Sequence, residues 1–166
     1  MLSIKIVDVK HFMNLLLKED TFDRFLLNEA TVKTGVSYII DGKINTNFYD
    51  TEEQEAIGVR THCYFAEQRP FLFSLMKGKK VPLSFRIVFM LAPANVQKLL
   101  ELNQFSFQAS DINGLFLNLH FEQGVLTCTS GSSLRIFTLD KTLDQVWEHY
   151  LKVFFKKHQI PFEELE

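Results

Sequence analysis

The sequence predicts an α+β fold in which a duplicated strand–helix–strand–strand–strand unit forms a mostly antiparallel sheet backed by helices. Two observations predict it. Residues 2–7 recur almost unchanged at 83–88, with four of the six positions identical and the other two conservative. In both places a helical stripe of apolar residues follows, and then short alternating segments separated by glycines. Strands that return through tight turns pair antiparallel, and helices on one side cover their apolar face.

The first unit covers residues 1–50. Residues 2–7 alternate between apolar and polar side chains, which predicts a half-buried strand. Asp8 can cap the next helix, whose apolar stripe includes Phe12 and Leu16. The remaining predicted elements are a strand at 22–33, a turn at Gly35, a strand at 36–40, a hairpin turn at Asp41 and Gly42, and a strand at 44–49.

Residues 51–82 are the predicted connector between the two units. An acidic run from Asp50 to Glu55 indicates a short helix with a solvated face. Residues 64–76 have helical character but contain Pro70. This proline either interrupts the helix or occupies the first turn of a shorter one.

The second unit covers residues 83–140. Residues 83–91 give the clearest strand pattern, because every odd-numbered position is apolar. Pro93 suits the first position of a helix that ends near Asn103. The remaining predicted elements are a strand at 115–121, a turn at 122–124, a strand at 125–129, a turn at Gly131 and a strand at 134–139. Residues 141–158 predict an additional C-terminal helix, whose basic end suits the helix dipole.

The match between the two units extends to their glycines. Gly35 corresponds to Gly124 and Gly42 to Gly131, seven residues apart in each copy. Turns that require a positive φ select glycine, so a shared turn gives a physical reason for the match. We interpret the match as a duplication. Chance is the alternative, since strand sequences draw on few residue types.

Composition fits one domain spanning residues 1–166. Apolar residues make up 46% and charged residues 23%, which argues against disorder. The net charge of −2 provides no global basic field for nucleic acid or an anionic membrane. Neither a signal peptide nor a membrane-spanning apolar run is evident, and Cys63 with Cys128 makes no disulfide framework. We therefore expect a cytoplasmic protein without a membrane contact.

Two resemblances follow from these patterns. The tandem strand–helix–three-strand order over residues 2–140 resembles one domain of the DNA sliding clamps, although the connector and the C-terminal helix depart from the clamp pattern. The whole chain also resembles a bacterial family, a domain of unknown function. The stretches that carry this second resemblance are Arg69-Pro70-Phe71 with Ser74, Lys77-Gly78-Lys79, and Phe137-Thr138-Leu139-Asp140-Lys141 with Trp147. It implies no activity.

One basic cluster is the candidate binding site. Its members are Arg69, Lys77, Lys79, Lys80 and Arg86, with Phe71 and Phe73 between them. Lysines on a glycine-containing loop can hold phosphate, and exposed aromatic rings can stack on bases. The glycine spacing is not that of a Walker-type phosphate loop. The alternative interpretation is a solvated turn beside core phenylalanines.

Other polar residues give no catalytic or metal signature. His120 and Cys128 lie on neighbouring predicted strands and could approach each other, but two further metal ligands are missing. We expect a half-buried histidine and a packed thiol. The serines at 130–133 lack the nucleophile-elbow spacing and predict a hairpin turn.

These observations favour a non-catalytic binding or protein-interaction module with an unidentified protein partner and no cofactor. The alternative is a nucleic-acid-associated protein with a sliding-clamp-like fold, which would bind through residues 77–80. A third hypothesis is an enzyme whose groups meet only in the fold, for example around His120 and Glu122.

Overall fold

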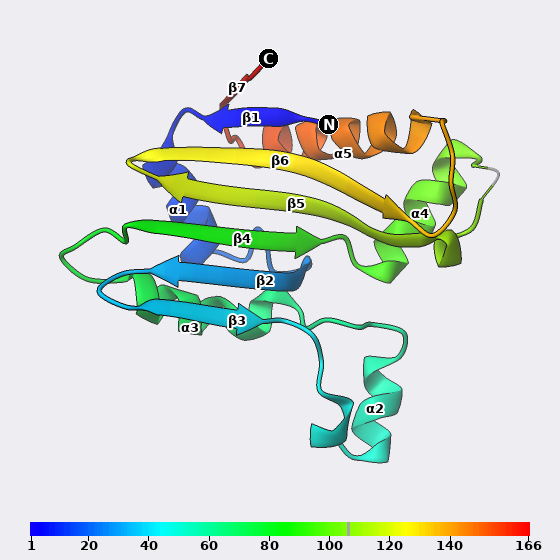
Figure 1. Cartoon of the computed structure of the whole chain (residues 1–166), viewed down its shortest axis with the longest axis horizontal. Coiled ribbons are helices and arrows are strands. Elements are labelled where there is room, and N and C mark those ends of the chain that lie inside the picture. Colours follow the sequence, from blue (N-terminus) through cyan, green and yellow to red (C-terminus); the bar gives the residue numbers. More distant parts are fainter. Residues whose placement is uncertain (106) are drawn as a thin grey trace.

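A seven-stranded antiparallel sheet organises the protein, and the computed structural model describes residues 1–105 and 107–166. The strands are β1 (Ser3–Ile6), β2 (Leu26–Lys33), β3 (Ser37–Asp41), β4 (Ser84–Met90), β5 (Ile112–Glu122), β6 (Val125–Leu134) and β7 (Phe162–Glu164). The α-helices are α1 (Val9–Leu17), α2 (Thr51–Ile57), α3 (Phe65–Met76), α4 (Pro93–Asn103) and α5 (Thr142–Lys157), with short 3-10 helices at Thr46–Phe48 and Ala109–Asp111. The strand order is β3-β2-β4-β5-β6-β1-β7 (Figure 1).

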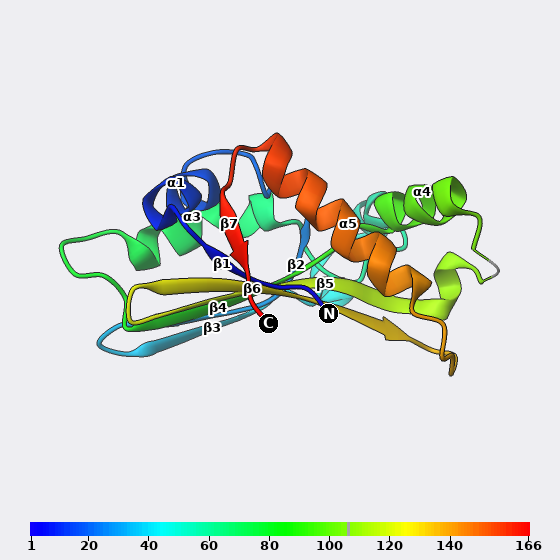
Figure 2. The same ribbon diagram turned by 90° about the horizontal axis from the view of Figure 1, so that it is seen from above.

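Helices α1, α3, α4 and α5 lie on the same side of the sheet (Figure 2), which confirms the predicted α+β class. Helix α2 projects away from the rest of the chain, beyond β3 (Figure 1). Among the residues described, none of the helices combines the length and the apolar character that crossing a bilayer requires.

The core lies between the sheet and this helical layer. Along β4, Phe85, Ile87 and Phe89 are buried under the helices, whereas Arg86 and Val88 point to the open face. Burying each of these large apolar side chains contributes about 2–3 kcal/mol. The indole N–H of Trp147 on α5 donates to a backbone carbonyl of β5, at 2.9 Å, and fixes that helix against the sheet.

The predicted last strand of each unit is wrong. Residues 44–49 contain a 3-10 helix, because the side-chain amide of Gln54 donates to the carbonyls of Thr46 and Tyr49 and holds the chain in a turn. Residues 135–139 form no strand, and the side chain of Phe137 is 91% exposed. Each half is therefore a strand–helix–strand–strand series.

The predicted turn at Gly131 is also wrong. Strand β6 continues through the serine-rich segment 130–133, and Gly131 lies opposite Phe116 of β5. Strand neighbours differ between the halves as well: β4 pairs with β5, whereas three strands separate β1 from β2, and β1 pairs with β6 and β7. The strand pairing thus does not repeat, and the structure does not confirm the duplication.

Pro70 neither interrupts α3 nor occupies its first turn. The helix runs through the proline from Phe65 to Met76. A proline inside a helix removes one backbone hydrogen bond. Burial of Phe65, Leu72 and Met76 against the core offsets that loss.

Gly42 closes β3 by a close backbone approach instead of a hairpin turn. Its N–H donates to Asn28 at 3.0 Å, and its carbonyl accepts from Cys63 at 2.9 Å. A β-carbon at position 42 would lie 1.8 Å from the carbonyl oxygen of Leu27. Glycine is required here because the backbone at the end of β3 lies directly against the backbone of β2.

Substitution Gly42→Ala should therefore lower the free energy of unfolding by about 2–4 kcal/mol, because backbone must move to admit the methyl group. Gly35→Ala is the matched control, since no atom lies within 4 Å of the added carbon. It should change stability by less than about 1 kcal/mol. Urea denaturation of both variants measures the difference, and equal effects would contradict the close approach.

Candidate ligand-binding cleft

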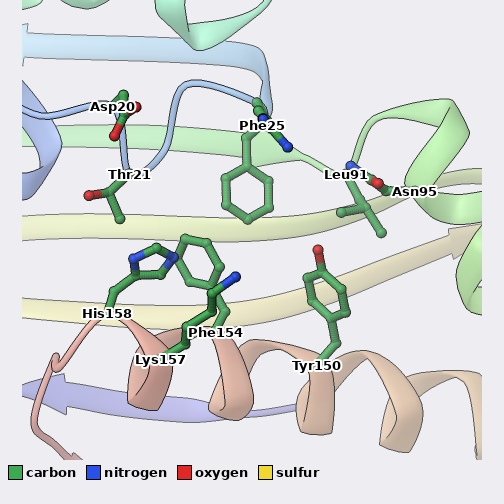
Figure 3. Close-up of a pocket in the computed structure, with 10 residues that line it drawn as sticks. Asp20, Thr21, Phe25, Leu91, Asn95, Tyr150, Phe154, Lys157 and His158 are labelled. Atoms are coloured by element: carbon green, nitrogen blue, oxygen red, sulfur yellow. The ribbon is translucent and has the colours of Figure 1, made fainter.

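A cleft of about 390 Å³ lies between the α1–β2 connection, residues 18–25, and the C-terminal half of α5 (Figure 3). We call it the α5 cleft. Side chains from both walls and from the β4–α4 junction line it: Asp20, Thr21, Arg24, Phe25, Leu91, Asn95, Tyr150, Phe154, Lys157 and His158. The cleft thus collects charged, polar and aromatic groups from segments far apart in the sequence.

Helix α5 supplies one wall because it carries two neighbouring stripes. Leu143, Trp147, Leu151 and Phe155 form the buried stripe. Tyr150, Phe154 and His158 follow each other at intervals of four residues, which places them in a row beside it. This second row faces the cleft.

The opposite wall is held in place by an ion pair. Asp23 accepts two hydrogen bonds from Arg69 of α3, at 2.8 Å from Nε and 3.0 Å from Nη2. The hydrogen bond to Asp23 is the main cause that raises the pKa of Arg69. Phe65 N–H also donates to the carbonyl of Phe25 at 2.9 Å. The connection is therefore anchored to α3, although the sequence predicted that its residues 22–25 begin a strand.

Aromatic rings form the floor of the cleft. The rings of Phe25 and Phe154 meet edge to face with centroids 5.3 Å apart. Phe25 also stacks on the buried ring of Phe89 at 5.4 Å, and Phe154 contacts Phe22 at 5.5 Å. The rings of Phe25 and Phe154 point into the same space as the hydroxyl end of Tyr150 (Figure 3). The apolar floor is therefore preformed.

Charged and polar groups form the rim. Arg24 and Lys157 are exposed cations on opposite walls, and Asp20 is one carboxylate. Burial lowers the pKa of His158, Lys157 lowers it further, and Asp20 opposes the shift. Burial raises the pKa of Tyr150, so its hydroxyl keeps its proton at neutral pH. The rim therefore offers two cations, one carboxylate, a hydroxyl donor and a largely neutral imidazole.

A family model described as a family of unknown function, DUF5721, matches residues 15–163. The chain belongs to this family. The match confirms the resemblance to a domain of unknown function and spans every residue that lines the α5 cleft. A search of curated proteins and a search of solved structures found no match. The resemblance to a sliding-clamp domain stays a prediction.

The basic cluster predicted from the sequence is spread over three places. Arg69 is half-buried and paired with Asp23. Lys77, Lys79 and Lys80 are exposed in the connection after α3, and Arg86 lies on the open face of the sheet. Binding of nucleic acid by the loop lysines stays a prediction, and the structure does not join the two arginines to it.

His120 and Cys128 do not approach each other, because they lie on opposite faces of the sheet. His120 is exposed, with Nε2 3.6 Å from a carboxylate oxygen of Glu122. Cys128 is the packed thiol that we expected, and burial raises its pKa. In the part of the chain that the structure describes, no three His, Cys, Asp or Glu side chains converge as metal ligands.

Sequence reasoning missed the α5 cleft. The row Tyr150, Phe154 and His158 was a usable signal, because its four-residue spacing marks a helix face next to the core stripe. The other wall gave no local signal, since its position depends on the pair of Asp23 with Arg69, 46 positions apart.

Arg69→Gln should lower the free energy of unfolding by about 1–3 kcal/mol, because it leaves the largely buried carboxylate of Asp23 without its partner. The control Arg86→Gln changes an exposed arginine and should cost less than about 0.5 kcal/mol. Chemical denaturation compares the two. Similar losses would show that the ion pair does not anchor the cleft wall.

His158→Gln tests the electrostatics of the rim through pH. The pKa of His158 in the folded chain lies below its ordinary value of 6.5, so the unfolded chain binds more protons below that pH. Wild-type stability should therefore fall as the pH drops from about 7 to about 5, and the variant should show a shallower fall. Part of the pH dependence should remain in the variant, because burial also lowers the pKa of His62. Urea titrations across this range measure it, and an unchanged slope contradicts the assignment.

Proposed function

We propose that this protein is a non-catalytic binding module that holds a small organic anion with a planar apolar part in the α5 cleft. One observation carries the proposal: two cations, a hydroxyl donor and two phenylalanine rings line one hollow. Its volume of about 390 Å³ lies within the range typical of small-molecule sites.

The charge of the rim selects an anion. Arg24 and Lys157 contribute two positive charges and Asp20 one negative charge, so the lining has a net charge of +1 with His158 neutral. A guanidinium can also bind a carboxylate or phosphate through two parallel hydrogen bonds. Because the two cations come from opposite walls, they would attract an anion in the cleft from both sides.

The floor selects a planar apolar group. Phe154 is half-buried and offers ring surface to the cleft beside the mostly buried ring of Phe25, and a flat group can lie against this surface. Tyr150 would donate a hydrogen bond to a polar atom on that group. These contacts require a ligand with a ring and an acidic substituent.

The same geometry supports binding in preference to catalysis. Among the residues that the structure describes, no hydrogen bond joins two side chains of the cleft into a nucleophile and its base. The raised pKa of Tyr150 keeps this hydroxyl protonated, which suits a donor. We also propose a cytoplasmic location, which the two free thiols Cys63 and Cys128 favour.

A set of four probes tests the ligand class. Benzoate and phenyl phosphate carry both a ring and an anion, benzyl alcohol only the ring, and acetate only the anion. Amide NMR shifts should place the first two at Tyr150, Phe154 and His158. Benzyl alcohol and acetate should each bind at least about tenfold more weakly, since each lacks one set of contacts.

Matched variants test the site. Lys157→Gln should weaken benzoate binding about tenfold, whereas Lys156→Gln alters an exposed neighbour outside the cleft and should have no effect. Equal losses from the two variants, or shifts that appear elsewhere, would refute the proposal. The double variant Lys79→Gln/Lys80→Gln separates the nucleic-acid alternative, which predicts that this change abolishes salt-dependent binding to DNA or RNA.

A further inference from the structure

The two edges of the sheet differ in how well they are protected from pairing with another strand. Strand β7 is short, carries Glu163 and Glu164, and Glu164 pairs with Lys152 of α5. Strand β3 is longer, contains neither lysine nor proline, and carries one charged side chain, Asp41, at its end. Exposed edge strands readily pair with other chains unless such devices prevent it. The β3 edge is therefore the less protected one.

Apolar side chains are exposed along this edge. Ile39 is 71% exposed, Val36 61% and Tyr38 40%. Ile39 points to the open face of the sheet, because its partner Thr31 does, while Tyr38 lies on the helical side opposite Val32. Both faces of the edge thus offer apolar surface to a neighbouring strand.

The alternation of hydrogen bonds along β3 shows which of its backbone groups point away from β2. Gly42 donates to Asn28, and Val36 accepts from Thr34, so even-numbered residues of this segment bond inward. Bonding alternates along an antiparallel strand. The N–H and C=O groups of Ser37, Ile39 and Asp41 consequently face away from β2.

A projecting arm, residues 44–60, borders the same edge. It lies beyond β3 (Figure 1), and no residue of its helix α2 is buried. Phe48 and Val59 of the arm are more than four-fifths exposed, at 83% and 82%. The capping box of Asp50 and Glu53 stabilises the start of α2 within the arm. A chain placed against β3 would also cover this arm.

We propose that a second copy of this chain pairs with β3, antiparallel about a two-fold axis through Ile39, so that the two sheets become one. In this register Ser37 lies opposite Asp41, Tyr38 opposite Ile40, and Ile39 opposite itself. The outward N–H and C=O groups of all three odd-numbered residues then find partners.

The strand is complementary to itself in this register. No like charges are opposed, because Asp41 meets Ser37. Tyr38 with Ile40 is an aromatic and β-branched pair, a combination that stabilises antiparallel strands. The two-fold axis also brings each arm alongside the other copy, which closes the assembly at two chains. An unrelated peptide would gain the backbone bonds but would lack the second arm.

Sedimentation equilibrium of the whole chain tests the pairing. We expect a mass of twice 19.4 kDa at a concentration of about 100 µM, a typical range for modest interfaces. Ile39→Lys places two ammonium groups face to face on the axis and should raise the dimer dissociation constant at least about tenfold. Val125→Lys, at an exposed apolar position of β6, is the control and should leave it unchanged. Unchanged thermal melting confirms that both variants fold.

Ile39→Cys tests the register. The two α-carbons on the axis would lie about 5.5 Å apart, within reach of a disulfide. Mild oxidation should therefore link two copies, whereas Lys33→Cys, on the inner strand, should not. A monomeric wild type, an effect of Val125→Lys equal to that of Ile39→Lys, or no link at position 39 would each overturn the proposal. None of the residues that line the α5 cleft belongs to β3, so ligand binding and pairing can fail independently.

Discussion

Phe89, in the central strand β4, contacts three aromatic rings that come from outside the sheet: Phe22, Phe25 and Phe65, with centroids 4.9 to 5.4 Å apart. This cluster joins the α1–β2 connection and α3 to the sheet, and Phe154 extends it to α5. The floor of the α5 cleft is thus the outer layer of the core. A small hollow can keep its shape there because close-packed rings support it from below.

Sequence patterns predicted the elements that local contacts determine. Strand β4 and helix α5 show strong periodicity, and both form where the pattern indicates. Elements that depend on distant partners were predicted poorly. Gly131 was assigned to a turn, but β5 keeps it in a strand, and Gly42 is explained by the backbone of Leu27. The local sequence around each glycine does not show that β5 lies beside Gly131 or that Leu27 lies beside Gly42.

The same distinction explains the sites. The basic residues from Arg69 to Arg86 are close in sequence. Arg69 lies on helix α3, however, and the alternation of side chains along β4 directs Arg86 to the open face of the sheet. The cleft residues are remote in sequence, and a pair such as Asp23 with Arg69 brings one wall into position. Clusters of charge along a chain are therefore weaker guides to a site than rows on one helix face.

The position of β1 between β6 and β7 has a consequence for biosynthesis. Among the described residues, β1 pairs with segments that are synthesised much later than itself, at residues 127–129 and 162–164. Leu2, Ile4 and Ile6, all buried in the finished protein, have no strand partner until then. Contacts at such separation slow folding and prolong the exposure of apolar surface. Strand β1 must therefore stay unpaired, and in need of protection by chaperones, until β6 has been synthesised.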